Sequence, residues 1–302
     1  MITQVRCDDR EVATEPTKRA DDRLALAAAL VTVCAWASGF VAIRAVADQL
    51  SPGAMTLLRL SVTSVLLAVP LATRRAPLPG RSALGGAVLC GVLWFGVYNV
   101  ALASGERLVD AGTAAMLVNI GPVLIALLAG VVLREGFPRP LLAGSTIGLA
   151  GICVIALGVS RGHAPLRGVL LCLLAAGSYA GAVVAQKPAL ARSSVLSVTF
   201  VASLVGLVAC LPFAPALARE LPHAPGSAIA GTVYLGVAGA LGFVTWGYAL
   251  ARTSAGRAAS MTLLVPPIAV LLGWIVLDEA PAPLAIAGGL IALGGVIVAR
   301  RR

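Results

Sequence analysis

Long apolar runs separated by short polar connections dominate the chain. Ten of them have the length of about 17 to 25 residues that a membrane-crossing helix requires. The runs are too long and too continuous for barrel strands, and a backbone in hydrocarbon must pair its own polar groups, so helices are expected. The ten runs are Leu24–Ala47, Gly53–Ala72, Leu84–Ala103, Asp110–Leu133, Leu141–Val159, Gly168–Gln186, Val195–Leu211, Ile229–Ala251, Ala255–Leu277 and Ala282–Ala299. The pattern predicts an all-α integral membrane protein with ten transmembrane helices.

Polar segments lie at both ends of this pattern. The first 22 residues are rich in acidic side chains and lack the basic start and the cleavage site of a secretory signal. We therefore expect residues 1–23 to form a disordered cytoplasmic tail and residues 300–302 a short basic cytoplasmic end. The connections carry proline, glycine or charge and are too short to fold into separate domains.

Composition agrees with a bilayer as the solvent. Apolar residues make up 59% of the 302 residues and charged residues 12%, with a mean hydropathy of +0.96, whereas soluble domains are about 25% charged. This excludes a soluble enzyme, a disordered protein and a receptor with a large outer domain. The chain has two histidines, both in loops, and neither an HExxH nor a Walker A motif. We expect no metal, no cofactor, no ATPase subunit and no enzymatic activity.

The basic surplus indicates orientation. Of 23 Lys and Arg residues, 17 fall in the tails and loops on the side of the two termini, and four fall in the opposite loops. The remaining two, Arg44 and Arg59, lie inside predicted spans. The positive-inside rule then places both termini in the cytoplasm, in a multi-pass protein of the cytoplasmic membrane. The net charge of +10 is thus a topology signal, and we expect no nucleic-acid partner.

The chain contains an internal repeat. When residues 111–155 are set beside residues 255–299, 16 of 45 positions are identical, with Pro122/Pro266 and Glu135/Glu279 in register. Earlier in each half, Phe95/Phe243 and Tyr98/Trp246 align at an offset of 148, and Trp36/Tyr179 and Arg44/Lys187 align at 143. The repeating unit is therefore five helices, at 24–159 and 160–299.

An odd number of helices makes the second unit enter the membrane from the opposite side. Inverted repeats are typical of secondary transporters, whose substrate sites lie at the repeat interface near the midplane. A passive channel or facilitator could share this inversion and is the alternative function.

Motifs in both halves occur in the order and spacing of a known family. They are Trp36-Ala-Ser-Gly-Phe-Val-Ala-Ile-Arg44, Pro52 to Arg59, Ala111-Gly-Thr-Ala-Ala with Pro122 and Leu133-Arg-Glu135, Tyr179 to Lys187, and Tyr248-Ala-Leu-Ala-Arg-Thr-Ser-Ala-Gly256 with Pro266 and Glu279. The chain resembles the drug/metabolite transporter superfamily, specifically its ten-span EamA type with two EamA repeats. The resemblance implies a carrier, often an exporter, of amino acids, other small metabolites or amphiphilic drugs.

Aromatic and polar residues near the middle of spans are candidates for a substrate pocket. Aromatic residues that anchor a helix at the membrane surface sit at span ends, and buried amides need partners. Packing between helices is the competing explanation. The substrate-binding candidates are Trp36, Ser38, Tyr98, Asn99, Asn119, Tyr179, Trp246 and Thr262. We expect them to line a central cavity formed by spans 1, 3, 4, 6, 8 and 9.

Charged residues and prolines within spans are candidates for gating or hinge roles. Arg44 and Lys187 could instead snorkel to the lipid headgroups, and Arg59 could contact substrate, act in gating or pair with a helix C-terminus. Pro122 and Pro266 are expected to kink spans 4 and 9. Glu135 and Glu279 stand where the helix dipole disfavours acids, so each is expected to meet an arginine or a backbone donor, or to mark the membrane edge.

No carboxylate lies deep in any predicted span. Coupling to protons is therefore expected to be absent or to use Glu135, Glu279 or the substrate itself. The same lack of acids disfavours strongly cationic cargo and suits amphiphilic, zwitterionic or neutral metabolites. The expected partners are a small-molecule substrate and the lipid bilayer, with the protein acting by alternating access as a monomer or homodimer.

Overall fold

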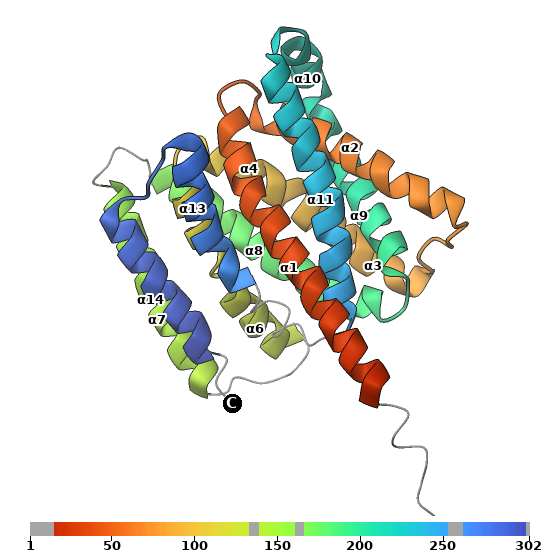
Figure 1. The fold of residues 1–302 in the computed structure, drawn as a ribbon, viewed down its shortest axis with the longest axis horizontal. Helices are drawn as coiled ribbons and strands as arrows, with labels where there is room; N and C mark the ends of the chain where they lie inside the picture. The colour runs from red at the N-terminus through yellow and green to blue at the C-terminus, as the bar shows by residue number, and fades with distance from the viewer. Residues whose placement is uncertain (1–14, 133–138, 161–165, 253–261, 300–302) are drawn as a thin grey trace, which may run out of the picture.

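The computed structural model describes residues 15–132, 139–160, 166–252 and 262–299, which contain helices and no strand (Figure 1). In the first half the elements are α1 (Glu15–Val46), α2 (Pro52–Thr73), α3 (Arg81–Cys90), the π-helix η1 (Gly91–Tyr98), α4 (Asn99–Gly105), α5 (Ala111–Val118), α6 (Gly121–Val132) and α7 (Arg139–Ser160). In the second half they are α8 (Leu166–Leu190), α9 (Val195–Ala209), η2 (Leu211–Phe213), α10 (Ala214–Glu220), η3 (Leu221–His223), α11 (Gly226–Arg252), η4 (Thr262–Leu264), α13 (Val265–Leu277) and α14 (Pro283–Ala299).

Six helical segments of the described chain are long and apolar enough to cross a membrane. They are α1 from Leu24, α2, α3 to α4, α5 to α6, α8 and α11. A seventh results if α9 is joined to the segment Leu211–His223, which is bent from it by 46°. Shorter apolar helices lie at Leu142–Ile155, Thr262–Leu277 and Pro283–Val298. The chain is therefore a multi-pass membrane protein.

Large apolar side chains cover the outside of the helices. Ile275 is 67% exposed, Val131 is 65% and Leu290 is 64%. Soluble monomers rarely expose contiguous apolar surface of this kind, whereas lipid tails solvate it at no cost. The distribution of apolar side chains thus matches a bilayer environment.

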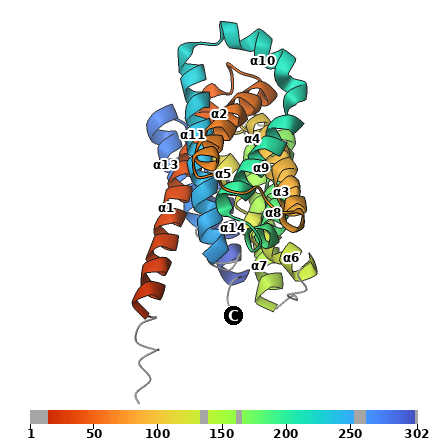
Figure 2. The same ribbon diagram turned by 90° about the vertical axis from the view of Figure 1, so that its right-hand side faces the viewer.

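The ends of the predicted runs differ from the structure at two places. Helix α1 begins at Glu15, so the predicted disordered tail is wrong for residues 15–23, and residues 1–14 lie outside the described residues. After α9 the chain stays helical through η2, α10 and η3, in the lid-like segment at the top of Figures 1 and 2. Phe213 from this segment covers Gly53, and the Glu220 Oε2 atom accepts a 2.7 Å hydrogen bond from Ser51 N at the start of α2.

Helices that pack on one another in the structure have counterparts in the other half that also pack on one another. Helix α1 packs on α11, and the corresponding pair α8 and α3 is also in contact. Likewise α2 packs on α11 as α9 packs on α3 and η1. Corresponding helices also pack on one another, among them α2 with α9, α5 with α13 and α7 with α14. Figure 1 shows the last pair beside the main group of helices.

Glycines bring α7 and α14 into backbone contact. A Cβ atom added to Gly151 would lie 2.5 Å from Ala292 N and 2.6 Å from Gly288 O. One added to Gly295 would lie 2.5 Å from Gly148 N. Small residues at helix interfaces allow such approach in a membrane, where close packing replaces the hydrophobic effect as the driving force. The glycine positions therefore fix the distance between these two helices.

We predict that Gly151→Ala destabilises the protein, because its new methyl group meets backbone atoms that cannot move independently. Overpacking of this kind costs about 1–3 kcal/mol. The measurement is the thermal unfolding midpoint in detergent. Gly294→Ala in α14 is the matched control, since a Cβ there meets nothing within 4 Å; equal midpoints for the two variants would contradict the packing argument.

Candidate functional site

A pocket with about 700 Å³ of empty space, part of it open to the surroundings, lies between the two halves of the chain. Its walls come from α1, α2, η1, α4 and α5 of the first half and from α8, α11, η4 and α13 of the second. Span 2 also contributes to the pocket through Arg59, in addition to the six spans that were predicted to form it. Ile43 and Leu102, close to the ends of α1 and α4, line the pocket, so it extends toward the face on which α1 ends and α2 begins.

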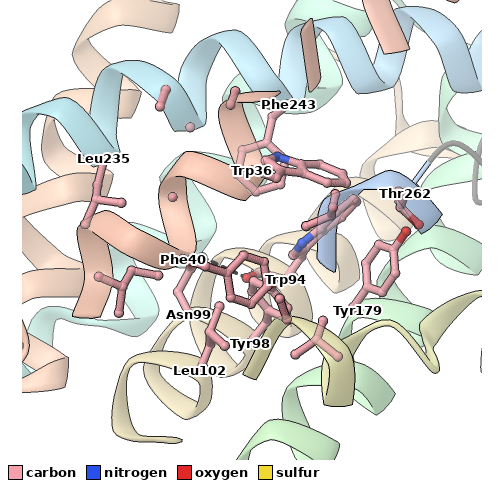
Figure 3. Close-up of a pocket in the computed structure, with 18 of the residues that line it drawn as sticks. Trp36, Phe40, Trp94, Tyr98, Asn99, Leu102, Tyr179, Leu235, Phe243 and Thr262 are labelled. Atoms are coloured by element: carbon pink, nitrogen blue, oxygen red, sulfur yellow. Dashed lines mark hydrogen bonds between the residues drawn. The ribbon is translucent and has the colours of Figure 1, made fainter. Parts of the chain in front are cut away.

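An aromatic layer crosses the pocket where the two halves meet (Figure 3). The Trp36 ring lies 5.5 Å from Trp94 and 5.2 Å from Trp246, centroid to centroid. Trp94 in turn lies 4.9 Å from Tyr179 and 5.0 Å from Phe243. Such edge-on and tilted contacts each add about 0.5–1.5 kcal/mol to simple burial. The layer is therefore an apolar floor that joins α1, η1, α8 and α11.

The repeat-related partners meet one another in this layer, with one imbalance. Trp36 and Tyr179, which correspond at an offset of 143, have ring centroids 6.4 Å apart. Trp94, however, corresponds to Gly242 at the offset of 148. A Cβ added to Gly242 would lie 2.8 Å from the Trp36 indole nitrogen. The first half therefore has an indole side chain, that of Trp94, at the position where the second half has the glycine Gly242.

A π-helix shapes the wall contributed by span 3. Within η1 the helical hydrogen bonds are displaced, and Asn99 Nδ2 donates to Trp94 O at 2.9 Å and to Phe95 O at 3.0 Å. The amide thus stabilises backbone carbonyls at the turn that carries Trp94 and Tyr98. Isolated π-turns of this kind are frequent at functional sites. Asn99 Oδ1 is buried and has no hydrogen-bond partner among the described residues.

Span 4 is broken at the pocket. Helix α5 ends at Val118, Asn119 caps it, and α6 begins at Gly121. Asn119 lines the pocket, and its Nδ2 is buried without a partner in the described chain. The predicted kink at Pro122 is wrong in form, because Pro122 starts the second helix, where its missing N–H is not needed. Pro266 likewise lies at the start of α13.

Arg59 is the charged residue of the pocket wall. It lies two turns into α2, and one guanidinium nitrogen is 3.6 Å from the place a Cβ of Gly239 would occupy on α11. No hydrogen bond or ion pair joins its side chain to the described residues. The suggested pairing with a helix C-terminus is thus not seen. A guanidinium in an apolar pocket favours an anionic ligand group, with which it forms strong bidentate hydrogen bonds.

Arg44 is held by an ion pair above the pocket. Its Nε lies 2.9 Å from Glu279 Oε1 and 3.1 Å from Oε2, and its Nη1 donates to Glu106 O at 3.3 Å. Arg44 therefore ties the end of α1 to the segment between α13 and α14 instead of snorkelling to lipid. The expectation that Glu279 meets an arginine is confirmed for this pair.

Lys187 occupies the corresponding place in the second half. Its Nζ donates to Leu250 O at 2.8 Å, near the end of α11, as Arg44 contacts the carbonyl of Glu106 just after α4. The suggested snorkelling is thus not what the structure has. Glu135, the counterpart of Glu279, lies outside the described residues.

Six of the eight substrate-binding candidates line the pocket: Trp36, Tyr98, Asn99, Asn119, Tyr179 and Thr262. The Tyr179 hydroxyl points toward Thr262 (Figure 3). Trp246, also part of the aromatic layer, is buried against Trp36 and does not line the pocket. Ser38 lies away from it, where its hydroxyl donates to Ala35 O and accepts from Tyr234.

Sequence reasoning missed several residues of this region. Phe40, Trp94 and Phe243 line the pocket. Trp94 is one turn before Tyr98, and Phe40 is one turn after Trp36, so helical spacing from the chosen aromatics was an available signal. Glu106 was placed in a loop, yet it is completely buried.

We predict that Asn99→Leu lowers the thermal unfolding midpoint, because two carbonyls of the π-turn lose their donor. An unsatisfied buried polar group costs about 1–3 kcal/mol. Ser104→Ala is the control in the same helix, since the Ser104 hydroxyl only adds a bond to Val100 O at the preceding turn. If the two variants unfold at the same temperature, the π-turn does not depend on the amide.

Comparison with known proteins agrees with this architecture. The EamA-like transporter family matches the chain twice, over residues 23–157 and 166–301. The "Probable terminal-alkyne amino-acid exporter" of Streptantibioticus cattleyicolor is 41% identical over 91% of this chain and 93% of its own length. The "Probable amino-acid metabolite efflux pump" of Salmonella typhimurium is 25% identical over 89% and 92%.

A solved crystal structure shares the fold. It superposes with a TM-score of 0.63 at 20% identity and covers 91% of this chain and 96% of its own. The double family match spans nearly all of the sequence, and a relative more than 30% identical matches it end to end. The chain belongs to the EamA-like transporter family.

Proposed function

We propose that this membrane transporter exports amphiphilic amino acids by alternating access. The proposal rests on one observation above all: Arg59, without a protein counter-ion among the described residues, lines a mostly apolar and aromatic pocket between the two halves. A carboxylate suits the guanidinium, and an apolar side chain suits Trp36, Trp94 and Phe243. The names of the two relatives, an amino-acid exporter and an amino-acid metabolite efflux pump, support the same class of cargo.

We propose further that the chain crosses the membrane ten times as two inverted five-helix repeats. A described helix lies in each of the ten apolar ranges. The packing pattern that survives exchange of the halves supports a twofold axis in the membrane plane. Such an axis lets the two halves exchange conformations, which is the basis of alternating access in transporters of this construction.

The direction in which the pocket extends indicates which state of the proposed transport cycle the structure represents. The pocket extends from the aromatic layer toward the face where α1 ends and α2 begins, opposite the termini. With both termini cytoplasmic, the aromatic layer closes the cytoplasmic side. The Arg44–Glu279 ion pair lies over the outer side. We assign the structure to an outward-facing, closed state in the cytoplasmic membrane.

Counterflow tests the carrier function directly. Liposomes containing the purified protein and unlabelled L-propargylglycine, a terminal-alkyne amino acid, are diluted into the labelled compound. A carrier gives transient, saturable accumulation of label. A flux that grows without saturation and shows no counterflow would identify a passive channel and overturn the proposal.

We predict that Arg59→Gln lowers the counterflow rate at subsaturating substrate about tenfold or more. A hydrogen bond to a charged group contributes about 1.5–3 kcal/mol. Arg74→Gln, at the exposed end of the same helix, is the matched control and should transport at the normal rate.

The methyl ester of L-propargylglycine provides a second measurement on the unchanged protein. It lacks the carboxylate and should fail to compete with the labelled amino acid. If Arg59→Gln transports normally, or if the ester competes as well as the free acid, Arg59 does not bind the carboxylate.

We predict that a reporter enzyme fused after Arg302 is active in the cytoplasm, because an even number of spans returns the chain to the side of its N-terminus. The measurement uses paired fusions to a reporter active only in the cytoplasm and one active only outside it. External activity would rule out the ten-span count without affecting the conclusion about the pocket.

A further inference from the structure

Glu106, directly after α4, is a buried acid whose carboxylate oxygens have no hydrogen-bond partner among the described residues. Its residue surface is 0% exposed, and neither carboxylate oxygen has a hydrogen-bond partner in the described chain. Its acidic neighbours differ in this respect. Asp110 accepts from Thr113 N and Oγ1 at 2.8 and 2.6 Å, and Glu279 pairs with Arg44. Burial without hydrogen bonds to its oxygens favours the neutral form of a carboxyl group.

Charged groups from four segments surround Glu106. Arg44 of α1 and Arg59 of α2 favour its ionised form, and Asp110 and Glu279 disfavour it. Tyr98 and Cys172, the other titratable groups near it, come from η1 and α8. Burial outweighs the two arginines and raises the pKa of Glu106 well above its ordinary value. The environment of the group therefore favours its neutral, protonated form in this conformation.

The position of Arg44 connects this acid to the outer ion pair. Its Nη1 contacts the backbone carbonyl of Glu106, while its Nε and Nη2 hold Glu279. While Glu106 is neutral, Glu279 is the anion that pairs with Arg44. Once Glu106 loses its proton, a second carboxylate competes for the same guanidinium, and the link between the end of α1 and the segment after α13 weakens.

We propose that Glu106 is a proton-binding site that couples export to inward proton movement by controlling the Arg44–Glu279 ion pair. The inference rests on the proposed transport function and adds its energy source. Glu106 takes up one proton from the outer side after substrate leaves, which closes the ion pair. The same proton dissociates to the cytoplasm in the opposite conformation, before substrate binds. One proton enters for each substrate exported.

Proton coupling is tested in the liposomes used for counterflow, with Glu106→Gln, which mimics the protonated acid permanently. For wild type we predict that a gradient of about one pH unit, alkaline on the cytoplasmic side of the protein, drives about tenfold substrate accumulation on its outer side, as one proton per substrate requires. Glu106→Gln should retain counterflow and accumulate nothing. Asp48→Asn is the matched control, since Asp48 is exposed and also close to Arg44, and it should behave as wild type.

The results separate failure of this inference from failure of the proposed function. Gradient-driven accumulation by Glu106→Gln equal to wild type would overturn the proton site, as would wild-type counterflow that ignores a pH gradient. Wild type without counterflow of any amino acid would overturn the transport proposal instead.

An infrared measurement without substrate tests whether Glu106 is protonated, whatever the transport experiments show. In infrared difference spectra on raising the pH, the carbonyl band of a protonated carboxyl should disappear in wild type and Asp48→Asn. The band should be missing throughout in Glu106→Gln. A wild-type protein without this band at neutral pH would overturn the inference.

Discussion

The demand that every backbone polar group find a partner in hydrocarbon governs the whole structure. Over most of each helix the regular hydrogen bonds meet it. The helical pattern is irregular at several places near the pocket, among them the π-turn before Asn99 and the break at Asn119. At the first, a side-chain amide substitutes for the lost backbone donors. At the second, a proline begins the next helix. Irregular backbone is tolerated there because it is enclosed by protein.

Helices pack in two different ways at the edge and in the middle of the molecule, and each way suits a different role in transport. At the edge, α7 and α14 meet through glycines, with backbone against backbone and little room for adjustment. In the middle, large aromatic rings join α1, η1, α8 and α11 by tilted and edge-on contacts. Rings can slide and rotate past one another more readily than backbones can separate. The edge pair is suited to be a fixed frame and the centre to be the part that rearranges.

The sequence predicts the helices well because apolar runs and bilayer thickness set their lengths. It also indicates Trp36, Tyr98, Asn99, Asn119 and Tyr179, since polar and aromatic side chains near mid-span need a reason to be there. It cannot predict that Arg44 pairs with Glu279, 235 positions away. Nor can it predict the burial of Glu106, which lies between two predicted spans and is enclosed only in the folded structure.

The mismatch between Trp94 and Gly242 limits how alike the two halves can be. In the proposed cycle each half takes up the shape that the other has just left. An indole cannot occupy the space of a hydrogen atom. The aromatic layer therefore packs well in the arrangement seen here and less well in the arrangement in which the two halves have exchanged conformations. The difference between Trp94 and Gly242 therefore gives the transporter a preferred resting state.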